Sequence, residues 1–134
     1  MELHRGRLFD HVHLKVRDLE ASKRFYRAVL EALGVPMGEE RPDAFWADEL
    51  YVSEGPALTA QMHLAFQAGD RETVQRFHAA ALAAGGRDNG APGERSAYHP
   101  GYYAAFALDP DGHNIEAVFH GSAPRSADSV VITI

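Results

Sequence analysis

Two stretches, HVHLKVRDLEASKRFYRAVLEALG at residues 11–34 and HLAFQAGDRETVQRFHAAALAAGG at residues 63–86, decide the fold because one repeats the other. A constant step of 52 residues aligns identical residues without a gap, among them His11/His63, Asp18/Asp70, Arg24/Arg76, Phe25/Phe77, Leu30/Leu82 and Gly34/Gly86. Self-similarity at a fixed step indicates a duplicated unit, and two copies are too few for a solenoid, which needs about three. We therefore expect one domain, 1–134, built from modules 1–60 and 61–134, whose leading histidines meet where the modules join.

Each copy has the pattern of a strand followed by a helix. Polar and apolar side chains alternate in residues 9–16, and in residues 63–68 Leu64, Phe66 and Ala68 share one face, which predicts two strands with one buried face each. Asp18 and Asp70 follow these strands and are suitable helix N-caps. Glycines at 34 and 85–86 then predict the helix ends.

Short strands are expected after each helix, near 34–40, 44–48 and 50–54 in the first module and near 87–89, 101–108 and 113–120 in the second. Between them, residues 89–100 are expected to form the longest loop, and the tail SVVITI to add a strand that pairs with a second subunit. The expected fold is α+β: two tandem βαβββ modules forming one cupped mixed sheet, with helices on its outer face. The polar strand faces would line the cup.

The composition argues against several classes of partner. The net charge is −6, the pI is about 5.7, and the eleven arginines and two lysines form no basic face, so we expect no nucleic acid and no membrane partner. Because cysteine is absent, metal ligands must be imidazole or carboxylate groups. Neither an apolar leader nor a run of about 18 apolar residues is present, and we therefore expect a cytoplasmic protein.

The segments HVHLKVRDLEASKRFY, MHLAFQAGDRETVQRF and YYAAFALDPDGHNIEAVFH together resemble the vicinal oxygen chelate superfamily, which includes glyoxalase I, bleomycin resistance proteins and extradiol dioxygenases. The resemblance covers nearly the whole chain. It implies one divalent metal ion (Fe, Mn, Ni, Co or Zn) bound by His11, His63 and Glu116, and a homodimer. Glyoxalase I usually adds a fourth ligand from the last strand of the first module, where strand order places Val52 or Ser53 opposite Glu116.

Two imidazoles and one carboxylate leave about three positions of an octahedral ion open, so a substrate with two neighbouring oxygens can chelate it. The sequence thus favours a metal-dependent lyase, isomerase or dioxygenase with a small oxygen-chelating substrate. The weaker catalytic candidates are His13, His99 and His120. The alternatives are a metal-free antibiotic- or metabolite-binding protein of the bleomycin-resistance type and a thiol transferase of the fosfomycin-resistance type.

Aromatic residues concentrate on the segments that border the expected cup: Tyr98, Tyr102, Tyr103, Phe45 and Trp46. Such side chains can hold a ring-shaped ligand, but alternate aromatics in strands more often fill the core. We expect at least half of them to be core residues.

Overall fold

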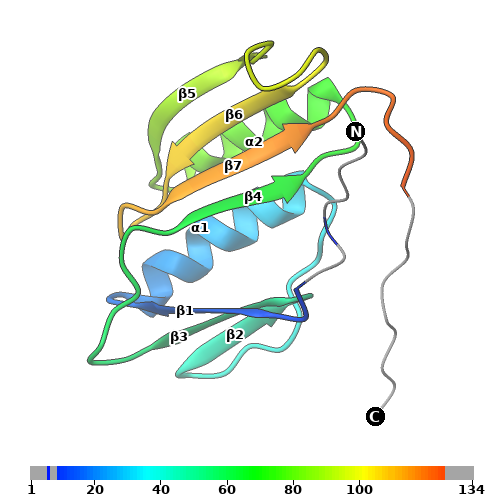
Figure 1. Cartoon of the computed structure of the whole chain (residues 1–134). Helices are drawn as coiled ribbons and strands as arrows, with labels where there is room; N and C mark the ends of the chain where they lie inside the picture. The colour runs from blue at the N-terminus through cyan, green and yellow to red at the C-terminus, as the bar shows by residue number, and fades with distance from the viewer. Residues whose placement is uncertain (1–5, 7–8, 126–134) are drawn as a thin grey trace.

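The computed structural model describes residue 6 and residues 9–125, and its elements alternate as the repeat predicts (Figure 1). The first half contains β1 (Val12–Val16), α1 (Leu19–Ala32), β2 (Ala44–Ala47) and β3 (Leu50–Glu54). The second half contains β4 (His63–Gln67), α2 (Arg71–Ala83), β5 (Arg87–Glu94), β6 (Tyr103–Leu108) and β7 (Asn114–Phe119). The expected strand at 129–134 lies outside the described residues.

Within the described residues the strands form two sheets, with the orders β1-β3-β2 and β4-β7-β6-β5. β1 pairs with β3 and β4 with β7 in parallel, while the other pairs are antiparallel. The α+β class and the mixed strands are therefore confirmed. The prediction of one continuous sheet is wrong, because β1 and β4 are edge strands of two separate sheets and do not pair with each other. These two edge strands run in opposite directions in Figure 1.

The first module has one strand fewer than expected. Residues 34–40 form only a bridge between Glu40 and Phe45. Gly38 and Glu39 still exchange backbone hydrogen bonds with Trp46, at 2.7 and 2.9 Å. Pro36 has no N–H to donate and Gly38 has little strand propensity, so the segment follows β2 without becoming a regular strand.

The expected loop at 89–100 is in part a strand. β5 continues to Glu94, with register shifts between Asp88 and Gly90 and between Gly90 and Gly93. The Gly and Pro residues of this segment indicated a loop, but an edge strand with bulges tolerates both.

Both predicted helix caps are present. The Asp18 carboxylate accepts a hydrogen bond from the Ala21 N–H at 3.1 Å, and Asp70 accepts one from the Thr73 N–H at 2.7 Å. Each bond satisfies one of the amide groups that have no partner inside the first turn of a helix.

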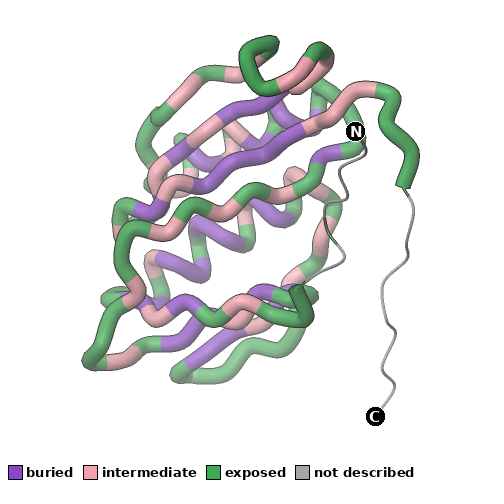
Figure 2. Tube along the Cα trace, viewed as in Figure 1, coloured by how far each residue is buried: buried purple, intermediate pink, exposed green. Residues whose placement is uncertain are grey.

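One hydrophobic core spans both halves of the chain, and Figure 2 shows buried segments on α1, α2 and the strands in front of them. The helices pack against each other, and the Phe25 ring of α1 lies directly over Gly86 of the second half. Nearby, the buried Tyr26 hydroxyl donates to the Asp109 carboxylate at 2.6 Å. The helices therefore occupy the side of the sheets opposite the polar strand faces.

Candidate functional site

A buried carboxylate at the centre of β7 forms the core of the site. Glu116 is 2% exposed, and its Oε2 lies 2.9 Å from Nε2 of His63. The parallel register sets Ala65 of β4 opposite Glu116. His63 precedes Ala65 by two residues, so it stands on the same face and reaches the carboxylate. The Tyr102 hydroxyl donates to the other oxygen, Oε1.

The charge of this carboxylate has little compensation from the protein. In the described part of the chain, His63 is its only ion-pair partner, and no Lys or Arg contacts it. A buried carboxylate is costly unless a cation or a proton balances it. A cation next to Oε2 would offset this cost.

His11 lies apart from this pair. It is exposed, and its Nδ1 contacts the Asp10 carboxylate at 2.7 Å. Residues 6 and 9–125 contain no group of three His, Asp or Glu side chains that could hold a metal ion. Because β1 and β4 run in opposite directions, their first residues lie at opposite ends of the two sheets (Figure 1). The leading histidines therefore do not meet within one copy of the chain.

A tyrosine occupies the position in the first module that corresponds to Glu116 in the second. His13 pairs with Tyr51 across β1 and β3, as Ala65 pairs with Glu116 across β4 and β7. Since the 52-residue step relates His13 to Ala65, Tyr51 corresponds to Glu116. The expected Val52 or Ser53 was wrong by one or two residues, because strand order alone does not reveal the register.

His13 faces the same side of the sheet as Tyr51. Its Nε2 lies 2.8 Å from the Ser53 hydroxyl, and its ring stacks on Tyr51. Burial lowers the pKa of the His13 imidazole below its usual value, and the charges of Lys15 and His11 lower it further.

The other two histidine candidates form a pair. Nδ1 of His99 lies 2.8 Å from the Pro100 carbonyl oxygen, which can only accept, so Nδ1 donates. Nε2 of His99 lies 3.0 Å from Nδ1 of His120, and the two rings stack with their centroids 5.2 Å apart. Both rings meet Tyr102 edge-on at 5.3 Å. The structure thus brings His99 and His120 next to the tyrosine that holds Glu116.

The expectation that at least half of these aromatic residues belong to the core is wrong, because only two of the five are buried. Phe45 and Tyr103 are buried in the core, whereas Trp46 and Tyr102 are half-buried and Tyr98 is exposed. No pattern in the sequence predicts the hydrogen bond from Tyr102 to Glu116, because the two residues meet only through the pairing of β6 with β7.

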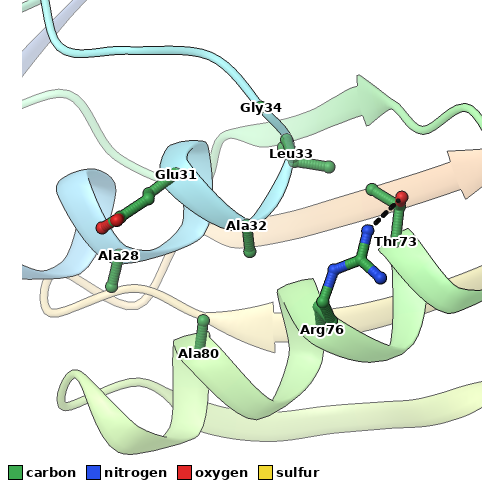
Figure 3. A pocket seen from close by; sticks show the side chains of 8 residues that line it. All are labelled: Ala28, Glu31, Ala32, Leu33, Gly34, Thr73, Arg76 and Ala80. Atoms are coloured by element: carbon green, nitrogen blue, oxygen red, sulfur yellow. Dashed lines mark hydrogen bonds between the residues drawn. The ribbon is translucent and has the colours of Figure 1, made fainter.

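A cavity of about 590 Å³ lies elsewhere, between α1 and α2 (Figure 3). It is lined by small and aliphatic residues together with the Glu31 carboxylate and the Arg76 guanidinium, which donates to the Thr73 hydroxyl at 2.9 Å. Its position on the helices separates it from the face that carries Glu116. Among the described residues, no helix is long and apolar enough to cross a membrane.

The chain matches the model of the Glyoxalase/Bleomycin resistance protein/Dioxygenase superfamily over residues 8–117. A glyoxalase/bleomycin resistance protein from Albidiferax ferrireducens T118 is 32% identical; the match covers 83% of this chain and 98% of that one, with a TM-score of 0.74. A glyoxalase-related enzyme from Fulvimarina pelagi (24% identity, 96% and 99% covered, TM-score 0.70) and a lactoylglutathione lyase from Agrobacterium tumefaciens (20%, 85% and 94%, 0.62) share the fold. None of the curated proteins compared matches the chain. The family match and the DPDG-x-x-I-E ending that carries Glu116 lead to one conclusion: this chain belongs to the glyoxalase/bleomycin resistance/dioxygenase, or vicinal oxygen chelate, superfamily.

Proposed function

We propose that the protein is a metal-dependent lyase, isomerase or dioxygenase that acts on a small substrate with two neighbouring oxygens. The buried Glu116 carboxylate, with the His63 imidazole 2.9 Å away, carries this proposal. One imidazole nitrogen and one carboxylate oxygen suit Fe, Mn, Ni, Co or Zn. A divalent ion would also balance the buried negative charge, which no Lys or Arg of the described residues does.

The third ligand, His11, would come from a second copy of the chain. His11 directly precedes β1 and His63 begins β4, and these strands point in opposite directions, so the two histidines lie apart in one copy. In a twofold dimer every contact occurs twice with the roles of the copies exchanged. The start of β1 in each copy can then meet the start of β4 in the other, which gives two equivalent sites. The homodimer is part of this proposal.

The side chains of this site would have separate tasks. The Tyr102 hydroxyl holds Oε1 of Glu116 and so directs Oε2 toward His63. When bound, the ion supplies Lewis acidity to the substrate oxygens. The hydrogen-bonded pair of His99 and His120, next to Tyr102, would accept or donate a proton. His13 is a further candidate for that role on the opposite sheet.

Metal content tests the proposal directly. We expect about one divalent ion per chain in protein purified without chelator, and a loss of most of it in Glu116→Gln, His63→Ala and His11→Ala. His78→Ala, on α2, is the matched control and should keep its metal. Metal affinity should fall at acid pH, because protonated imidazole cannot bind a metal ion.

Mixed dimers test where His11 comes from. A dimer of one His11→Ala chain and one Glu116→Gln chain has one site with both defects and one intact site if the ligands come from different copies. A statistical mixture should then recover about a quarter of the wild-type metal. If all three ligands came from one copy, mixing would recover none.

One observation favours a metal-free binding protein instead. No described part of a single chain gathers three residues suited to a metal. If the wild-type protein contained no metal and Glu116→Gln left ligand binding unchanged, the binding protein would be established over the enzyme.

A further inference from the structure

Four planar side chains form a continuous stack on the polar face of the first sheet. Trp46 and His13 are the direct cross-strand partners of Tyr51, so the three rings stand in a row across β2, β3 and β1. The His13 and Tyr51 centroids are 4.1 Å apart at 27°, and those of Tyr51 and Trp46 are 4.4 Å apart at 15°. The Arg41 guanidinium lies over the Trp46 ring at 5.0 Å. We define this row as the aromatic ladder.

The ladder faces away from the core. The residues that alternate with its members, Phe45, Leu14 and Val52, are fully buried under the helices. By contrast, His13 is exposed, and Tyr51 and Trp46 are half-buried. The rings are therefore held on edge above the sheet, with their faces toward one another along the row.

The two ends of the ladder differ. Arg41 closes the Trp46 end, but no ring or cation covers the outer face of His13 within the part of the chain that the structure describes. His13 belongs to β1, the edge of its sheet, and the bond to the Ser53 hydroxyl holds its ring in the stacking orientation. A flat surface held in position with one free face is suited to one more flat ring.

The second sheet has a small residue on its polar face beside Glu116. Its edge strand β4, which faces β1 in Figure 1, carries Ala65 on the polar face, directly beside Glu116. Ala65 has no side-chain atom beyond Cβ. A ring stacked on His13 would thus extend toward the strand that borders Glu116.

We propose that the aromatic ladder binds a planar aromatic ring on the free face of His13, and that the substrate of this protein is an aromatic compound. This proposal deepens the proposed function and rests on it for one point, that oxygen substituents of the ring bind the metal ion. Ring binding itself requires no metal.

The test uses chelator-treated protein with phenol and cyclohexanol, which have one hydroxyl each and differ in the ring. Binding is followed by titration of the indole N–H signal of Trp46, the single tryptophan of the sequence, and by calorimetry. Aromatic stacking predicts that phenol binds about 2- to 13-fold more tightly than cyclohexanol. His13→Ala should abolish this preference and His13→Phe should keep it, while His78→Ala leaves it unchanged.

Equal affinities in the wild type, or a preference that survives in His13→Ala, would overturn the proposal. Loss in both His13→Ala and His13→Phe would also count against it, since it would assign the effect to the imidazole nitrogens. The binding test uses chelator-treated protein, so its outcome does not depend on a metal ion. If the protein prefers phenol but contains no metal when purified without chelator, only the proposed function is refuted. If it contains metal but shows no preference for phenol, only the ladder proposal is refuted.

Discussion

Replacing Tyr26 by phenylalanine removes one hydroxyl from the interior and leaves the ring in place. The hydroxyl donates at 2.6 Å to Asp109, and both residues are almost fully buried. The Asp109 carboxylate also accepts from the N–H groups of Asp111 and His113, each at 2.9 Å, so it stays partly satisfied. A hydrogen bond to a charged group contributes about 1.5–3 kcal/mol, and we expect a loss of about 2 kcal/mol.

That loss corresponds to about 6–10 °C in Tm for a domain of this size. Urea unfolding followed by circular dichroism measures the free energy of unfolding, and calorimetry measures Tm. Tyr98→Phe is the matched control, because the Tyr98 side chain is 65% exposed, and it should change neither value. If Tyr26→Phe were no more destabilised than Tyr98→Phe, the buried bond would not stabilise the fold and the reasoning would be wrong.

The same residue predicts an alkaline limit to stability. Burial raises the pKa of Tyr26 well above its usual range, and the negative charge of Asp109 raises it further. In the unfolded chain tyrosine ionises near pH 10, so the unfolded state alone loses this proton as the pH rises. The free energy of unfolding should therefore fall above about pH 10 in the wild type and fall less steeply in Tyr26→Phe.

Two further changes test the helix ends. The Thr73 side chain, and then its backbone N–H, donate hydrogen bonds that lower the pKa of the Asp70 carboxyl. The cap therefore stabilises the fold above the pKa of Asp70 in the unfolded chain, and this contribution is lost as the pH falls through its pKa in the folded protein. Asp70→Ala should therefore lower Tm at pH 7, and the difference from the wild type should disappear near pH 2. Gly86→Ala would place Cβ 2.7 Å from the Ala81 carbonyl oxygen, and we expect a loss of about 1–3 kcal/mol in urea unfolding, whereas Gly69→Ala, with open space around it, should cost little.

The parts of the fold that depend on neighbouring residues could be predicted from the sequence. Asp18 and Asp70 cap their helices because the carboxylate and its amide partner are three residues apart. The shared polar face of His63 and Glu116 follows from strand parity, whereas their meeting at one site was implied by the family resemblance.

The parts of the fold that depend on how distant segments lie in space could not be predicted from the sequence. Tyr51 rather than Ser53 matches Glu116 because of a register that no local pattern encodes. His11 lies apart from His63 because β1 and β4 run in opposite directions, which the repeat alone leaves open. The position of Tyr102 beside Glu116 likewise requires the pairing of two strands.

The contacts of α1 with the second half have a consequence for the history of the duplication. Tyr26 reaches Asp109, while the matching residue of the other copy, His78, bonds locally to Asp88 at 2.9 Å. Phe25 likewise covers Gly86. The two halves have thus become unlike, and each now lacks part of its own interior. A gene that lost either half would encode a segment with an uncovered apolar face, so the duplication is no longer reversible by simple deletion.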